Sequence, residues 1–101
     1  MLYSTKVEEI SMIEELGEHG LLILLYLFRH GREYKAALQK KLRIGTTPMY
    51  RAFSVLYKYR LIREVREFPR VYVELTERGR AIAEKIHEAE ELLRRWESEQ
   101  P

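Results

Sequence analysis

The fold is decided by the stretch IGTTPMYRAF at residues 44–53. Its glycine closes a tight connection, and Thr46 or Thr47 is placed to cap the helix that follows. Pro48 falls in the first helical turn, where its missing amide hydrogen costs no hydrogen bond. The stretch therefore predicts a helix over about Thr47–Arg60 that begins directly after a tight turn.

Short elements are predicted on both sides of this helix. Residues 34–42 turn apolar side chains to one side and lysines to the other, which indicates a short helix, and residues 32–34 precede it as a short edge strand. From Leu61 to Leu75 the period changes to two, which predicts a hairpin with its turn at Glu67–Arg70. Two short helices joined by a tight turn and followed by a basic hairpin form an arrangement by which proteins read a DNA duplex.

The flanking segments read as helices of the same single domain. Residues 1–16 predict an N-terminal helix, and Leu21–Phe28 is apolar nearly all round, as in a buried core helix. Thr76 is placed to cap a long C-terminal helix. The chain therefore divides into an N-terminal helix at 1–16, a core at 20–75 and a C-terminal dimerisation helix at 76–98.

Both terminal helices carry narrow apolar stripes. In the last helix the apolar positions alternate spacings of four and three, which is typical of a helix that packs on another helix. A domain of 101 residues has little further apolar surface of its own to cover these stripes, so we expect the two terminal helices to pair with those of a second copy across a two-fold axis. The alternative is that the last helix folds back on its own core. The predicted dimer interface comprises Val7, Ile10, Ile13, Ile82, Ile86, Ala89, Leu93 and Trp96.

Three motifs resemble the winged helix-turn-helix regulators, the broad group that includes the MarR, ArsR and PadR families. They are residues 44–53, Leu56 followed by Leu61-Ile62, and residues 75–79, which are similar to a Leu-Thr-x-x-Gly signature after the wing. The resemblance covers about residues 20–86. It implies a mainly α fold with a small β-hairpin wing, a winged helix-turn-helix with N- and C-terminal dimerisation helices, and a role in transcription regulation. Arg60 departs from the pattern, because such proteins usually place a glycine there to end the helix in a left-handed conformation.

The charge is distributed unevenly although the net charge is only +2. Residues 29–63 hold ten Lys or Arg against the single acid Glu33, whereas both flanking segments are acidic. A basic middle third predicts a localised surface for a polyanion. The alternative is the general Lys and Arg content of proteins from hot environments, and the absence of Asn and Asp points to a thermophilic source.

The polyanion that fits this arrangement is double-stranded DNA. The first residues of the second helix would meet base edges in the major groove, with Arg51 forking onto guanine, Thr47 and Ser54 hydrogen-bonding, and Tyr50 contacting a thymine methyl or a phosphate. Other cations would hold phosphates, and arginines near the hairpin tip would reach the minor groove. The predicted DNA-binding set is Lys35, Lys40, Lys41, Arg43, Thr46, Thr47, Tyr50, Arg51, Ser54, Lys58, Arg63, Arg66 and Arg70.

Several classes of chemistry find no support in the sequence. The chain has no Cys, which excludes disulfides, thiolate metal sites and cysteine nucleophiles, and its three His are isolated. There is no phosphate-cradling loop and no nucleophile elbow, so we expect no enzyme, catalytic residue, metal or cofactor. The longest apolar run, Leu21–Phe28, is too short to span a bilayer and no basic leader precedes it, so a cytoplasmic location is expected.

Two other functions are compatible with this sequence. A winged helix can be a protein-interaction module whose basic face meets an acidic partner, or a non-specific architectural DNA binder in which Arg51 matters little. A small-molecule effector is left open because Tyr26, Tyr57, Tyr59 and Trp96 are candidates to line a pocket, although aromatic residues at such positions more often belong to the core.

Overall fold

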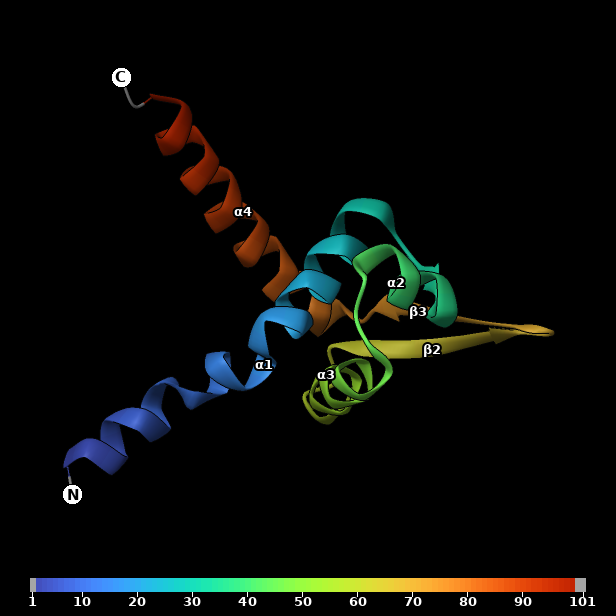
Figure 1. The fold of residues 1–101 in the computed structure, drawn as a ribbon, viewed down its shortest axis with the longest axis horizontal. Helices are drawn as coiled ribbons and strands as arrows, with labels where there is room; N and C mark the ends of the chain where they lie inside the picture. Colours follow the sequence, from blue (N-terminus) through green and yellow to red (C-terminus); the bar gives the residue numbers. More distant parts are fainter. Residues whose placement is uncertain (1, 100–101) are drawn as a thin grey trace.

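The computed structural model describes the backbone of residues 2–99 and the side chains of residues 12–99. Its element order confirms the predicted order. The elements are α1 (Leu2–His30), β1 (Glu33–Tyr34), α2 (Lys35–Leu42), α3 (Thr46–Lys58), β2 (Ile62–Glu67), β3 (Arg70–Leu75) and α4 (Glu77–Glu99). The outer ends of α1 and α4 diverge on one side of the molecule, and the β2–β3 hairpin projects from the opposite side (Figure 1).

A glycine divides α1 into two helical segments. Gly17 has φ 65° and ψ 173°, a backbone conformation that is not helical and that glycine adopts without steric cost. The segment after Gly17 is the most buried helix of the core, with Ile23, Leu24 and Leu27 at most 1% exposed. The expected break between an N-terminal helix and a core helix is therefore confirmed.

The sheet has three antiparallel strands in the order β1-β3-β2. β1 contributes only two residues and pairs with β3, so the predicted edge strand is present. Leu38 of α2, Leu56 of α3 and Val73 of β3 are fully buried between the helices and the sheet. The inward face of α3 carries four buried residues, Met49, Ala52, Phe53 and Leu56.

The start of α3 differs from the expectation. Neither Thr46 nor Thr47 caps the helix, because the N-cap position is taken by Gly45 in an extended conformation without a side-chain hydrogen bond. The Thr46 hydroxyl instead accepts a hydrogen bond from Gln39 Nε2 at 3.1 Å, which joins α2 to α3. α3 runs from Thr46 to Lys58, slightly shorter at its end than the sequence suggested.

The end of α3 explains the departure at Arg60. Arg60 itself has φ 57°, so an arginine adopts the left-handed conformation that a glycine would usually supply. The amide of Leu61 donates to the Leu56 carbonyl at 2.9 Å, and the Arg60 amide donates to the Tyr57 carbonyl at 2.9 Å. These two bonds close the helix in a Schellman arrangement, so the missing glycine leaves the helix end intact.

The Leu-Thr-x-x-Gly stretch joins the wing to α4. Thr76 caps α4 as predicted, because its hydroxyl oxygen accepts from the Gly79 amide at 3.0 Å while its hydrogen is donated to the Arg60 carbonyl at 2.6 Å. A Cβ atom on Gly79 would lie 1.8 Å from the Leu61 carbonyl oxygen. Only glycine therefore lets the first turn of α4 rest directly on the backbone of Leu61.

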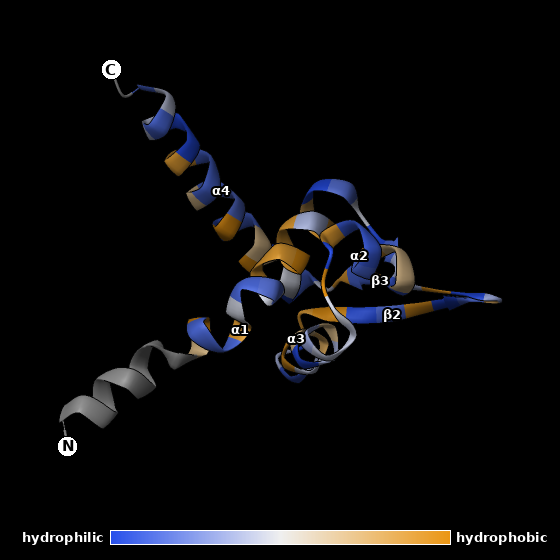
Figure 2. Cartoon of the chain, in the orientation of Figure 1, coloured by the Kyte–Doolittle hydropathy of each residue, from blue (hydrophilic) through white to orange (hydrophobic). Residues whose placement is uncertain are grey.

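The apolar stripe of α4 is covered only in its first turns. Ala83 is fully buried and Ile86 is partly buried against the core, whereas Leu93 and Trp96 are 60% and 53% exposed. Apolar bands continue along α4 as it leaves the body (Figure 2). The helix thus folds back on its own core at its start and not at its end.

The N-terminal stripe is exposed where it is described. Ile13 is 65% exposed, and Met12 beside it is 62% exposed. The predicted interface residues Val7 and Ile10 lie outside the residues whose side chains the structure describes. Within residues 2–99, no helix is long and apolar enough to cross a membrane.

Candidate nucleic-acid interface

One face of α3 projects from the body of the domain. Thr47, Tyr50, Arg51 and Ser54 follow the spacing of a single helix face, and all four are exposed. Tyr50 is 68% exposed, although large aromatic side chains are usually at least partly buried. The opposite face packs into the core, which fixes the orientation of this exposed face.

Four of the predicted DNA-binding cations form ion pairs with glutamates of other elements or of the neighbouring strand. They are Lys35 with Glu64 at 2.6 Å, Lys41 with Glu33 at 2.7 Å, Lys58 with Glu15 at 2.6 Å and Arg63 with Glu74 at 2.6 Å. Three of these glutamates, Glu15, Glu64 and Glu74, belong to the acidic flanks, which thus neutralise part of the basic segment. The surface is less basic than the charge count along the sequence indicates.

Three other cations of the predicted set are not neutralised by an ion pair. Lys40, Arg43 and Arg51 are exposed, and none of them pairs with an acid among residues 12–99. Arg66 on the wing reaches Glu64 only at 3.5 Å and its side chain is 80% exposed. Of the predicted DNA-binding cations, these four are the most available to an external polyanion, because the guanidinium of the remaining one, Arg70, donates to the Tyr34 hydroxyl.

Glu33 and Glu64 anchor α2 to the rest of the domain. Glu33 accepts from Lys41 and also from the Tyr26 hydroxyl at 2.8 Å, which ties α2 to α1. Glu64 accepts from Lys35 and from the Tyr57 hydroxyl at 3.1 Å, which ties α2 to the wing and to α3. The lysine hydrogen bonds are the main cause that lowers the pKa of each carboxyl, and desolvation together with the charge of Glu64 raises the pKa of Tyr57 to about 12.

Sequence reasoning missed these two anchors. One signal was present, because Glu33 is the only acid between residues 29 and 63. An isolated acid in a basic segment that is otherwise free of acids indicates a specific partner rather than a solvated side chain. Nothing in the linear sequence distinguishes Glu64 from the neighbouring acids of the wing.

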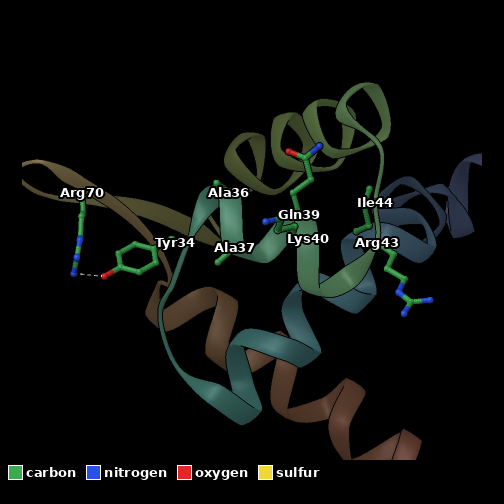
Figure 3. A pocket seen from close by; sticks show the side chains of 8 residues that line it. All are labelled: Tyr34, Ala36, Ala37, Gln39, Lys40, Arg43, Ile44 and Arg70. Atoms are coloured by element: carbon green, nitrogen blue, oxygen red, sulfur yellow. Dashed lines mark hydrogen bonds between the residues drawn. The ribbon is translucent and has the colours of Figure 1, made fainter.

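A groove of about 750 Å³ lies along α2 and reaches Arg70 at the turn end of the wing. Lys40 of α2 and Arg43 directly after α2 border it, Arg70 of β3 borders it at the wing, and alanines of α2 form part of its wall (Figure 3). Arg70 does not extend toward the tip, because its guanidinium donates to the hydroxyl of Tyr34. The groove offers cations to a chain of negative charges that crosses α2.

The four aromatic residues considered for an effector pocket are not gathered at one site. Tyr26 and Tyr57 donate to Glu33 and Glu64 respectively, and Trp96 lies on the exposed end of α4. Only Tyr59 of the four borders a groove of about 350 Å³ beside Met12, Leu16 and Ile82. No group of three or more metal-ligating side chains is present in the part of the chain that the structure describes.

No protein-family model and no curated protein matches the chain. Solved structures do resemble it. A ZitR mutant from Lactococcus lactis aligns with a TM-score of 0.70 at 22% identity, over 96% of this chain and 76% of that one. The adhesin competence repressor AdcR from Streptococcus pyogenes aligns with a TM-score of 0.68 at 22% identity, over 97% of this chain and 80% of that one.

A third structure matches nearly end to end. The transcriptional regulator homologue from Pyrococcus horikoshii OT3 aligns with a TM-score of 0.65 at 18% identity, over 92% of this chain and 94% of that one. At such identities the likeness establishes the fold. The chain is a winged helix-turn-helix domain, mainly α with a small hairpin wing, as the resemblance in the sequence implied.

Proposed function

We propose that this protein is a sequence-specific, double-stranded DNA-binding transcription regulator that acts as a homodimer. In this proposal α3 lies in the major groove and the wing lies near the minor groove. The observation that carries the proposal is Arg51, which stands exposed on the outer face of α3 without an acidic partner among residues 12–99. The winged-helix proteins that resemble this chain include ones named as repressors or regulators, which supports the same role.

The residues of the face divide into two roles. Arg51 presents a planar guanidinium that suits the O6 and N7 of guanine, while Tyr50 and Ser54 flank it. Lys40 and Arg43 precede α3 and hold phosphates, which position the protein without reading sequence. Cations that are already paired, such as Lys35, contribute less because a phosphate must compete with their glutamate partner.

The homodimer is supported by the apolar residues that the single chain leaves uncovered. Leu93, Trp96, Met12 and Ile13 are all more than half exposed, and they belong to the two terminal helices. Exposed apolar surface of this extent is typical of an interface. Two domains related by a two-fold axis would place their α3 helices about 34 Å apart, one turn of B-DNA, so the expected site is a palindrome.

The first test measures fluorescence anisotropy of a random-sequence duplex over a salt series. The double variant Lys40→Ala/Arg43→Ala removes two unpaired cations, and the control Lys41→Ala/Lys58→Ala removes two that are ion-paired. We expect the first variant to reduce the slope of log K against log salt by about 1.8, or about 0.9 per phosphate contact. The control, with the same loss of formal charge, should change the slope by less than half as much.

Sequence specificity is tested with Arg51→Ala on a duplex selected from a random library. We expect a loss of about 10- to 100-fold on the selected site, because one bidentate base contact is worth about 1–3 kcal/mol, and little loss on random DNA. A small loss on both duplexes would favour the architectural binder, in which Arg51 matters little. Failure of the wild-type protein to bind duplex at low salt would overturn the proposal and leave the protein-interaction module.

A further inference from the structure

We propose that the tip of the wing is an apolar wedge, formed by Phe68 and Pro69, which enters the minor groove and kinks the duplex. This inference rests on the proposed DNA-binding function. It assigns to the tip a mechanical role that differs from the arginine contact expected from the sequence.

The first observation is the composition and exposure of the turn. Hairpin turns usually use Gly, Pro, Asn, Asp or Ser, whose conformations or side chains suit a tight reversal in water, so the unusual residue of this turn is Phe68. Here the turn between β2 and β3 carries Phe68 and Pro69, and Phe68 is 99% exposed. By contrast, Phe53 is 5% exposed and Phe28 packs against the core. Phe68 contributes no buried surface to the fold.

The second observation is that both charged neighbours of the tip are held back toward the body. The carboxylate of Glu67 accepts two hydrogen bonds from the Arg32 guanidinium, at 3.0 and 3.1 Å. On the other strand Arg70 donates to the Tyr34 hydroxyl, and its guanidinium carbon lies 5.1 Å from the centre of the Tyr34 ring. The side chains that extend from the end of the wing are therefore those of Phe68 and Pro69.

These contacts continue as a ladder that braces the hairpin. The rings of Tyr34 and Tyr72 are stacked with centroids 4.6 Å apart, and the Arg32 guanidinium lies 4.0 Å over Tyr72. β1, β3 and the tip are thus joined by side chains as well as by backbone hydrogen bonds. A hairpin held rigid by these contacts can keep Phe68 inserted between two base pairs, whereas a flexible loop would bend away from them.

The charge around the tip favours DNA as the surface that receives it. Arg66 pairs with Val71 in the hairpin, close behind the tip, and its side chain is 80% exposed. The one acid of the turn, Glu67, is already neutralised by Arg32. Apolar wedges beside arginines insert between base steps from the minor groove and kink the duplex by roughly 20–90°.

The test uses energy transfer between dyes at the two ends of a 30-base-pair random-sequence duplex, at protein concentrations that saturate binding. We expect wild type to raise the transfer efficiency, as a kink brings the ends together. Phe68→Ser should still bind, about tenfold more weakly, but should leave the efficiency near that of free duplex. Phe68→Leu keeps an apolar side chain and should retain most of the rise.

A second readout and a charge control separate bending from attraction. With 2-aminopurine at pyrimidine–purine steps, the most easily unstacked steps, fluorescence should rise with wild type and not with Phe68→Ser. Arg66→Ala should lower the salt slope while the efficiency at saturation stays high.

The outcomes also separate this inference from the function on which it rests. Equal transfer efficiency for wild type and Phe68→Ser at saturation would overturn the wedge and leave DNA binding standing. Binding of wild type without a rise in transfer efficiency would also overturn the wedge. It would point to a protein surface as the target of Phe68. Absence of binding by wild type would overturn both proposals.

Discussion

The two sides of this molecule are built differently. Around α2, α3 and the wing, apolar side chains other than Tyr50 and Phe68 are mostly covered. Ion pairs there join elements far apart in the chain, such as Lys35 with Glu64 and Arg32 with Glu67. On the terminal helices, large apolar side chains such as Trp96 stand exposed, and charges pair within one helix, as Arg94 does with Glu90 at 3.0 Å. The first side presents mainly polar and charged groups, whereas the second leaves large apolar side chains uncovered in the single chain.

The largest expected effect on stability comes from disrupting the contact of α4 with the Leu61 backbone, which joins the two sides. In Gly79→Ala the new Cβ would meet the Leu61 carbonyl oxygen at 1.8 Å, so either α4 or the start of β2 must move. We expect the free energy of unfolding to fall by about 3 kcal/mol, as in other cases of overpacking against backbone. Chemical denaturation of the two proteins measures this difference.

The matched control for this variant is Gly20→Ala. Gly20 is also buried in a helix, but its nearest neighbour would lie 3.5 Å from the added Cβ, an ordinary contact. Removing a helical glycine should therefore stabilise the protein by about 1 kcal/mol. If Gly79→Ala proved as stable as Gly20→Ala, the close packing of α4 on Leu61 would be wrong.

A smaller effect is expected from the exposed end of α4. Leu93→Glu places a charge in the apolar stripe, and we expect it to weaken self-association about 30-fold, or about 2 kcal/mol, with the fold retained. Light scattering over a concentration series measures the dimer. Leu93 is a better choice than Ile86, because Ile86 is partly buried against its own core and its replacement would also test folding.

The control for Leu93→Glu is Ser98→Glu, which adds the same charge to the same helix beside the stripe. The control should keep the mass of the wild type. A wild-type protein that is monomeric at all concentrations would contradict the homodimer and would leave the terminal helices free for another apolar partner.

The elements could be predicted from the sequence because burial imposes a period on the chain. The inward face of α3 and the buried helix around Leu24 follow from apolar spacing alone. The cap by Thr76 follows from local chemistry, since its partner Gly79 is three residues away. Features that depend on neighbours in the sequence were therefore accessible.

The organisation of the charges could not be predicted in the same way. Glu15 meets Lys58 only because Gly17 bends α1 and brings its first segment against the end of α3, and the sequence does not specify that angle. Thr46 was expected to cap α3, but its hydroxyl serves Gln39 because Gly45 already occupies the cap position. Ion pairs between residues far apart in the sequence determine which lysines remain available to an external polyanion. The apolar periodicity of the sequence carries no information about these pairs.

The smallest effect concerns the ion pairs themselves and depends on pH. The pKa of Glu64 lies below the ordinary value of 4.5, chiefly because Lys35 donates a hydrogen bond to it. A carboxyl whose pKa is lowered by folding stabilises the protein above its unfolded pKa, and this contribution is lost as the pH falls through the folded pKa. Glu64→Gln should therefore lower the free energy of unfolding by about 1 kcal/mol at pH 7, and the difference from wild type should shrink below about pH 4.5. Denaturation curves at pH 7, 5, 4 and 3 measure this difference.

The control is the same substitution at Glu97, on the exposed end of α4, which should change stability little at any pH. A gap between wild type and Glu64→Gln that stayed constant down to pH 3 would show that Glu64 acts through packing rather than through its charge.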